Sequence, residues 1–334
     1  MYDPDSIELT VSEIGYLWTG YTINEMCSWY QIIFHQQLSD PEMKKLYAYA
    51  LNITTELVKK REQLLSIDEF PIPLGFSDMD INKQAPPLFS DRFVLHYLHI
   101  GSQLGLSFHA RALATATRVD VREYMADCLN AASQLYQNVL NLLLQKGLYW
   151  RPPTIPTPVT QERMKKQSYL NGWLGDIRPI NSMEIANLYS ILELLAMIEA
   201  LCIGFAQTAE TEETKEILQD GIKVAKAQYT QLVPLLTEDT LPDPPSFVGE
   251  ITDTQETVFS DRLMVSHIAG LFGSLITLSG SSIGSVMKHD LMTTYATLHL
   301  IAGAYAEKVT KFLIKHEWLE KVPGATDRRT LIHS

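Results

Sequence analysis

The chain has 334 residues and a formal net charge of −12, with 39 acidic and 27 basic side chains. Nucleic acids and anionic membranes bind basic patches, so this acidic balance excludes both as expected partners. The three cysteines, Cys27, Cys128 and Cys202, are far apart in the sequence. They exclude a disulfide scaffold and a CxxC metal site and indicate a reducing compartment such as the cytoplasm. The N-terminal sequence MYDPDSIELT lacks the basic and apolar segments of a signal peptide.

Four helices are predicted in residues 1–150. Each helix start is marked by a side chain that can accept hydrogen bonds from the first amides of a helix. In chain order these starts are Thr10 with Glu13, Asp40 before Pro41, Ser90, and Asp120. The first and second helices are joined by a short turn, as are the third and fourth, whereas residues 66–89 form a long proline-containing connection. The fourth helix carries apolar residues at every third or fourth position, and no segment alternates as a strand does.

The remainder of the chain repeats this unit. The segment LFSDRF at 88–93 recurs as VFSDRL at 258–263, at an offset of 170, and residues 64–73 recur at 235–244, at an offset of 171. The helix starts recur as well, at Asn181 with Glu184, Thr211, Ser260, and Asp290. A unit of roughly 150 residues has the size of a domain, so the sequence predicts two similar domains in tandem. The predicted organisation is a first repeat at 1–150, a proline-rich linker at 151–177, a second repeat at 178–323, and a C-terminal tail at 324–334.

The connection lengths predict the topology of each repeat. A helix of about 27 residues is roughly 40 Å long. Some 22 extended residues reach about 70 Å, so the long connection can return the chain along its whole bundle. Two short turns and one long crossover are the connectivity of ferritin-like bundles. The predicted fold class is therefore all-α, with two tandem ferritin-like four-helix bundles that arose by internal duplication.

One segment of the second repeat resembles a membrane span. Residues 263–287 carry no Asp, Glu, Lys or Arg and are long enough to cross a bilayer. They also contain six serines and four glycines, and the corresponding part of the first repeat contains three histidines and an arginine. We therefore predict a core helix of a soluble protein and no membrane span.

A ferritin-like bundle can hold two metal ions between glutamates and Glu-x-x-His motifs. No Glu-x-x-His occurs in this chain, so no di-metal site and no cofactor are predicted. The fallback metal site consists of His96 and His99, three residues apart on one helix, together with Glu25. Their equivalents in the second repeat include Ser266 and Ala269, so this site would belong to the first repeat alone. The alternative is a polar core in which the same side chains are hydrogen-bonded.

Buried charges need partners. For an inward-facing Glu25 we predict a pair with Arg61 or Arg111. A corresponding network in the second repeat is predicted from His267, Tyr229 and Glu199.

The repeated Ser-Asp-Arg motif is the most distinctive pattern in the chain. It comprises Ser90, Asp91 and Arg92 in the first repeat and Ser260, Asp261 and Arg262 in the second. We interpret it as a helix start followed by a charge pair that fastens the crossover to the bundle. The alternative is a binding site for a partner.

Three segments carry a family resemblance: RPINSMEI at 178–185, FSDR at 259–262, and EWLE at 317–320 with the residues that follow at 323–328. They resemble a family of tandem ferritin-like proteins of endospore-forming bacilli, related to spore coat proteins. The resemblance covers nearly the whole chain. It implies a fold and a sporulation context, and it assigns no catalytic residues.

These observations favour a non-enzymatic structural or protein-interaction protein associated with sporulation or the spore coat. Its expected location is the cytoplasm, the forespore or the spore coat, and its expected partner is another protein or a second copy of itself. One alternative is a helical bundle that binds a small apolar molecule or a lipid, using the Gly/Ser-rich helix of the second repeat to leave a cavity. The other is a degenerate ferritin-like, metal-dependent oxidoreductase.

Overall fold

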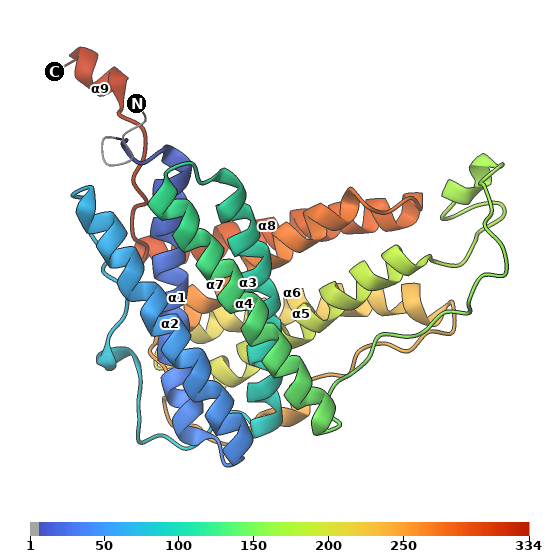
Figure 1. The fold of residues 1–334 in the computed structure, drawn as a ribbon. Helices are drawn as coiled ribbons and strands as arrows, with labels where there is room; N and C mark the ends of the chain where they lie inside the picture. Colours follow the sequence, from blue (N-terminus) through green and yellow to red (C-terminus); the bar gives the residue numbers. More distant parts are fainter. Residues whose placement is uncertain (1–6, 334) are drawn as a thin grey trace. The chain divides into compact units, whose positions relative to one another are not determined.

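The computed structural model describes residues 7–333, and within them the protein is helical, with no strand (Figure 1). The long helices of the first repeat are α1 (Val11–Gln37), α2 (Pro41–Ile67), α3 (Asp91–Thr115) and α4 (Val119–Gln145). Those of the second repeat are α5 (Ser182–Thr208), α6 (Glu212–Thr237), α7 (Asp261–Ile283) and α8 (His289–Lys315). Short helical elements are η2 (Asp78–Asp80), η3 (Gln167–Leu170), η4 (Val248–Glu250) and α9 (Arg328–His333).

The duplication predicted from the sequence is confirmed by the helices. The starts of α5 and α6 lie 171 residues after those of α1 and α2, and the starts of α7 and α8 lie 170 residues after those of α3 and α4. Residues 64–73 still recur at the offset of 171, so the lost residue falls after residue 73, in the long connection. This connection runs over 68–90 in the first repeat and 238–260 in the second, because α6 has one residue fewer than α2. The other turns within each repeat have three to five residues.

Most of the predicted helix starts are confirmed. Side chains at six predicted positions accept hydrogen bonds from first-turn amides: Thr10, Asp40, Ser90, Asn181, Thr211 and Ser260. The predicted caps Asp120 and Asp290 are wrong, because α4 begins at Val119 and α8 at His289. Each aspartate therefore lies inside the first turn, where a carboxylate interacts favourably with the helix dipole.

By its contacts the chain forms two compact units. The first unit contains the described residues up to Ile81, Leu98–Leu142, and the residues from Leu319 onward. The second unit contains Asn82–Tyr97 and Leu143–Trp318. The end of the first repeat's crossover and the start of α3 thus pack with the second repeat.

The core of the first unit draws on all four of its long helices. Its buried cluster comprises Leu17 from α1, Leu64 and Leu65 from α2, Ala112 from α3, and Val121, Tyr124, Met125 and Cys128 from α4, together with Leu9. Cys128 is completely buried there, as expected for a small core residue.

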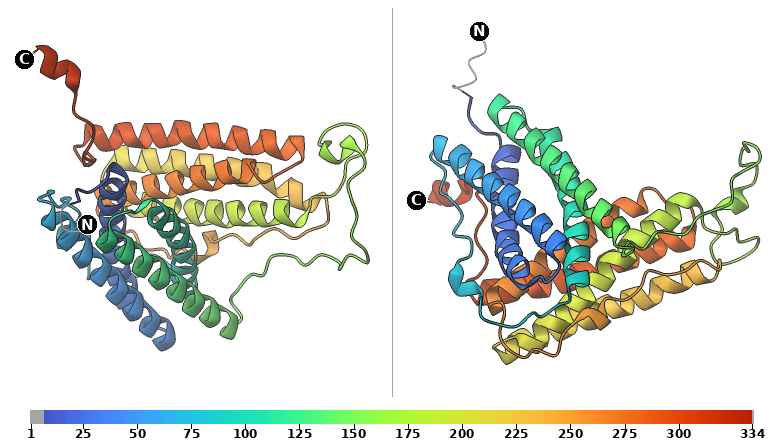
Figure 2. Two further views of the ribbon diagram at one scale, coloured as in Figure 1. Left: turned by 45° about the horizontal axis from the view of Figure 1, so that its top comes forward. Right: turned by 60° about the horizontal axis from the view of Figure 1, so that its bottom comes forward.

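In the second unit, α5 packs against α6 and α7, and α8 packs against α7 and α6, so that four helices enclose one core (Figure 2). α5 and α7 are both long and apolar enough to cross a membrane. In α5, 78% of the most apolar window is buried inside the protein, and in α7 the share is 50%. Burial against protein is typical of a core helix, which agrees with our interpretation of residues 263–287.

The two crossovers meet inside the second unit with a local two-fold symmetry. The Asn82 N–H donates to the Val258 carbonyl at 2.9 Å, and the Thr252 N–H donates to the Leu88 carbonyl at 3.0 Å. These two bonds are equivalent under the repeat, because Thr252 lies 170 residues after Asn82 and Val258 lies 170 residues after Leu88. Tyr97 Oη also lies 3.1 Å from Nε2 of its own repeat equivalent, His267. Reciprocal contacts of this kind are typical of the interface of a two-fold dimer.

Candidate functional site

Glu13 lies at the centre of a buried cluster in the first unit, which we call the first anchor cluster. Its Oε2 accepts hydrogen bonds from the Thr10 N–H and Oγ1, both at 2.8 Å. Its Oε1 accepts from the N–H groups of Thr117 and Arg118, both at 2.7 Å, in the turn between α3 and α4. The side chain is 1% exposed. One carboxylate therefore joins the start of α1 to the start of α4.

The second anchor cluster repeats this arrangement around Glu184, which is completely buried. Glu184 Oε2 accepts from the Asn181 N–H at 2.8 Å, and Oε1 accepts from the N–H groups of Met287 and Lys288 at 3.2 and 3.3 Å. Arg178 adds two hydrogen bonds of 2.8 Å, one to each carboxylate oxygen. Such a bidentate pair is among the stronger charge-assisted contacts in proteins.

Both anchor carboxylates are held in the ionised form. Burial acts to raise the pKa of Glu13, but hydrogen bonds from the amides of Thr10, Arg118 and Thr117 outweigh it and lower the pKa from 4.5 to about 2. Burial opposes ionisation of Glu184 as well, and the Arg178 guanidinium with the neighbouring amides lowers its pKa. Neither group is therefore protonated at neutral pH, and the lone pairs of each are occupied by fixed donors.

Ion pairs surround each anchor carboxylate. Arg118 pairs with Asp68 at 2.6 Å and with Asp120 at 2.8 Å, and Lys288 pairs with Asp290 at 3.3 Å. The members of the two clusters correspond through the repeat offsets: Glu13 with Glu184, Asp68 with Asp239, Arg118 with Lys288, and Asp120 with Asp290. The two glutamates were predictable from their capping boxes, whereas the basic residues Arg118 and Lys288 are recognisable in the sequence only as basic positions that recur at the offset of 170.

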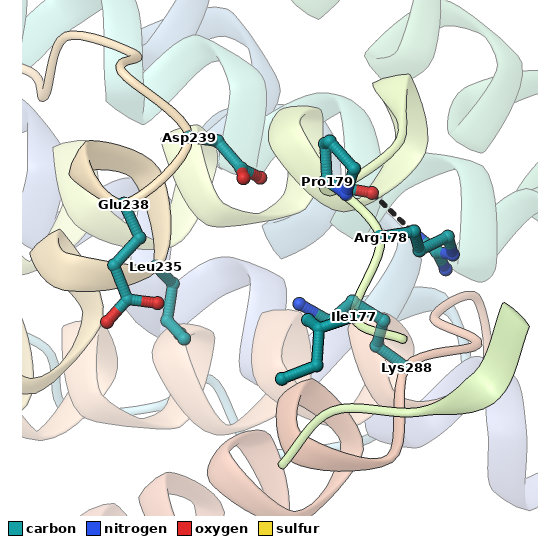
Figure 3. Close-up of a pocket in the computed structure, with 7 residues that line it drawn as sticks. All are labelled: Ile177, Arg178, Pro179, Leu235, Glu238, Asp239 and Lys288. Atoms are coloured by element: carbon teal, nitrogen blue, oxygen red, sulfur yellow. Dashed lines mark hydrogen bonds between the residues drawn. The ribbon is translucent and has the colours of Figure 1, made fainter. Parts of the chain in front are cut away.

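A small pocket of about 120 Å³ lies beside the second anchor cluster (Figure 3). It is lined by Ile177, Arg178, Pro179, Leu235, Glu238, Asp239 and Lys288. Figure 3 shows Glu238 and Asp239 on one side and Arg178 and Lys288 on the other. Arg178 is engaged by Glu184 and by the Pro179 carbonyl, and Asp239 accepts a hydrogen bond from the Ile180 amide at 2.7 Å. Arg178 and Asp239 in the pocket lining are thus already engaged in contacts that hold the helix ends together.

The first copy of the Ser-Asp-Arg motif caps α3 and contacts Glu250 in the crossover of the second repeat. Ser90 Oγ accepts from the Phe93 N–H at 3.1 Å and donates to Glu250 Oε2 at 2.5 Å. Arg92 lies 3.4 Å from Glu250 Oε1 and over the ring of Trp150. Asp91 is in the first turn of α3. Arg92 therefore pairs with the crossover of the second repeat, not with that of its own repeat.

The second copy fastens a different turn. Ser260 caps α7 by accepting from the Leu263 N–H at 3.1 Å. Asp261 is buried and accepts from the N–H groups of Glu210 and Thr211, at 2.9 and 3.0 Å, and from Thr211 Oγ1 at 2.6 Å. It thereby ties the start of α7 to the start of α6. Arg262, the last residue of the motif, follows in the first turn of α7.

Asp261→Asn is expected to destabilise the second unit by about 1–3 kcal/mol, because an amide cannot accept hydrogen bonds with both of its terminal atoms. Hydrogen exchange of the peptide that covers the start of α6 should rise while the first unit is unchanged. Asp253→Asn, in the same crossover region, is the matched control and is expected to change stability by less than about 0.5 kcal/mol. Equal exchange in the two variants would contradict the fastening role of Asp261.

The structure does not assemble the fallback metal site. Among the described residues no group of three or more His, Cys, Asp or Glu side chains is placed to hold a metal ion. His96 Nε2 lies 3.1 Å from the Leu148 carbonyl and its ring stacks on Trp150, while His99 stacks on Tyr136. Glu25 accepts hydrogen bonds from the Trp29 indole and, at 2.9 Å, from the Phe76 N–H.

The predicted polar networks are also wrong in their partners. Arg61 does not pair with Glu25 but donates from Nη1 to the Gly20 carbonyl. Tyr229 donates to the Pro244 carbonyl and to Asp243, rather than joining Glu199 and His267. Helical phase placed Arg61 and His267 inward, whereas Tyr229 and Glu199 are only partly buried. It carries no information about which loop atom lies opposite each side chain.

Comparisons with known proteins support the duplication. The family described as "Protein of unknown function (DUF3231)" matches the chain twice, over residues 2–160 and 168–331. A search of curated proteins finds no match. A solved structure, described as a "putative spore coat protein" from Bacillus halodurans C-125, is similar at 17% sequence identity. The alignment covers 45% of this chain and 98% of that one, with a TM-score of 0.41.

Proposed function

The chain belongs to this family of proteins of unknown function, with one match in each repeat, and from that premise we propose a non-enzymatic structural or protein-interaction protein. Each repeat would be a ferritin-like four-helix bundle used as a scaffold. The two short turns and single long connection in each repeat support this fold. The metal and catalytic chemistry of such bundles is not part of the proposed role.

The observation that carries this proposal is the use of the buried carboxylates. Glu13 and Glu184 occupy the inward first turn of their helices, and both are saturated by backbone amides or an arginine. An acid–base group needs a pKa near the working pH and access to substrate. A carboxylate with a lowered pKa and no free lone pair instead serves as a rigid fastener between helix ends.

A protein partner is supported by exposed apolar side chains in the linker of the second unit. Trp173 is 60% exposed, Leu174 83% and Ile177 51%. Aromatic and large aliphatic residues on a surface are enriched at protein interfaces. We place the contact with a partner, or with a second copy of the chain, at this segment.

The sporulation context is supported by the resemblance of residues 178–185, 259–262 and 317–328 to spore-coat-related proteins of endospore-forming bacilli. On this proposal the protein resides in the cytoplasm of the mother cell or forespore, or in the spore coat. It acts there by binding another protein or a second copy of itself, and not by catalysing a reaction.

The test combines sedimentation of the purified protein with a fluorescent fusion in sporulating cells of an endospore-forming bacillus. The double variant Trp173→Ser, Leu174→Ser is expected to weaken association at least about tenfold, the equivalent of about 1.4 kcal/mol, and to disperse a fusion that otherwise collects at the forespore. Ile155→Ser with Val159→Ser is the matched control, because both residues are exposed in the same linker. A fusion that never localises, with association unchanged in the Trp173 variant, would contradict the proposal.

A further inference from the structure

Arg61 is an arginine with no exposed surface in the core of the first unit. It lies on α2 one turn after Leu57 and one turn before Leu64 and Leu65, all of which belong to or pack against the apolar cluster of that unit. Its guanidinium is 5.5 Å from the ring centroid of Tyr124 on α4. A cation in such a place loses its hydration, and this loss is unfavourable unless a partner replaces the water.

The hydrogen bonds of Arg61 compensate for only part of this loss. Nη1 donates to the Gly20 carbonyl on α1, whereas Nε and Nη2 have no hydrogen-bond partner. The N–H bonds of Nε and Nη2 point the same way along one edge of the guanidinium. That edge binds the two oxygens of a carboxylate side by side.

Among the described residues, no carboxylate or carbonyl accepts a hydrogen bond from this edge. Gly20 lies against the face of the guanidinium, where a side chain would come within 2.4 Å of Nη2. His109 on α3 is also buried, and its Nδ1 has no hydrogen-bond partner. Burial, with the charge of Arg61, lowers the pKa of His109 to about 3, so that its ring is neutral. No carboxylate of the described residues therefore pairs with Arg61, and a second polar group, His109, is buried in the same core.

The second repeat shows that this helix arrangement does not require the charge. At the equivalents of Gly20 and Arg61 it has Ile191 and Leu232, both completely buried. The equivalent of His109 is Ser279, whose hydroxyl donates to the Ile276 carbonyl of its own helix. The buried arginine is thus particular to the first repeat, and in the second repeat two buried aliphatic residues replace Arg61 and Gly20.

We propose that Arg61 binds a small planar oxyanion, of the size of formate or acetate, in the core of the first unit through Nε and Nη2. His109 supplies a neutral polar contact to the same ligand. The chemical class is a carboxylate or an anion of the same shape, such as nitrate or bicarbonate. A spherical halide cannot use both donors as well, because it offers one centre instead of two oxygens.

The first experiment uses the full chain in its wild-type form. Its thermal unfolding is followed at neutral pH in sodium acetate, formate, nitrate or chloride at matched ionic strength. Acetate or formate is expected to raise the transition of the first unit by about 3 °C over chloride, and [13C]acetate should show a second, protein-bound resonance. A transition that is the same in all four salts, with no bound resonance, would overturn the proposal.

Two variants localise the effect. Arg61→Leu, which copies the second repeat, is expected to abolish the acetate shift and the bound resonance. Arg111→Leu removes an exposed arginine of α3 and is expected to retain both. An acetate response that persists in Arg61→Leu would overturn the site. If that variant does not fold, Arg61→Lys replaces it. Lysine keeps the positive charge but lacks the paired N–H donors of the guanidinium, so the affinity for acetate should fall at least about tenfold.

Discussion

Glu13→Gln is expected to destabilise the first unit by about 3 kcal/mol. Both carboxylate oxygens accept hydrogen bonds from buried amides or hydroxyls of Thr10, Thr117 and Arg118. A glutamine turns an NH₂ group toward one of these sets of donors, so buried N–H groups lose their acceptor. Hydrogen exchange should rise about a hundredfold, the equivalent of about 2.8 kcal/mol, in peptides that cover the turn between α3 and α4.

The matched control is Glu56→Gln on α2. Glu56 is exposed and its contact with Lys59 at 3.1 Å is a surface ion pair, so the expected change is below about 0.5 kcal/mol. The second unit provides an internal reference, because its own anchor Glu184 is unchanged. Similar exchange in the Glu13 and Glu56 variants would contradict the anchor role.

The same carboxylate makes the first unit sensitive to acid. Its pKa is about 2 in the folded protein and 4.5 ordinarily. A lowered folded-state pKa gives stability that is present above pH 4.5 and is lost as the pH falls toward 2. In Glu13→Gln the difference in stability from the wild type should therefore shrink over that window, which acid titration of hydrogen exchange or circular dichroism measures.

Gly20→Ala is expected to destabilise the first unit by about 1–3 kcal/mol, although alanine is the better helix former. The added methyl group would lie 2.4 Å from Nη2 and 2.5 Å from Cζ of Arg61. Arg61 has no exposed surface, so its guanidinium must give up its bond to the Gly20 carbonyl in order to move. Chemical denaturation of the purified variant measures the loss.

A double-mutant cycle tests the cause. Arg61→Leu is expected to restore most of the stability lost in Gly20→Ala, because Ile191 and Leu232 show that an apolar pair fits at these positions in the second repeat. Gly15→Ala is the matched control on the same helix. A methyl group there meets no neighbouring atom, so the variant is expected to gain up to about 1 kcal/mol. Additive effects of the Gly20 and Arg61 changes would show that the two residues are not coupled.

The sequence predicted the duplication and most helix starts because these are local features. A capping box such as that of Thr10 with Glu13 is written in four consecutive residues. The second half of the anchor was not predictable from such a pattern. Its donors are the amides of Thr117 and Arg118, more than 100 residues away. Every residue except proline has a backbone N–H, so the residue types do not show which amides will bind the carboxylate.

Long-range pairing also explains the incorrect predictions. Asp120 and Asp290 precede apolar stripes and look like caps, but the amides before those helices are bound by the anchor glutamates instead. Arg92 was expected to hold a crossover, and only the packed structure shows that it holds the crossover containing Glu250. Periodicity tells which side chains face inward; it does not tell which chain segment faces them.

The central claim is that the buried polar residues fasten helices and do not form a metal-dependent catalytic site. Elemental analysis with native mass spectrometry, on full-length protein purified without chelator, tests it most directly. We expect far less than one equivalent of iron, manganese or zinc per chain. The measured mass should correspond to the protein alone or to a defined oligomer, apart from any bound small anion. One or more equivalents of metal, lost in His96→Ala, would contradict the account and favour the oxidoreductase alternative.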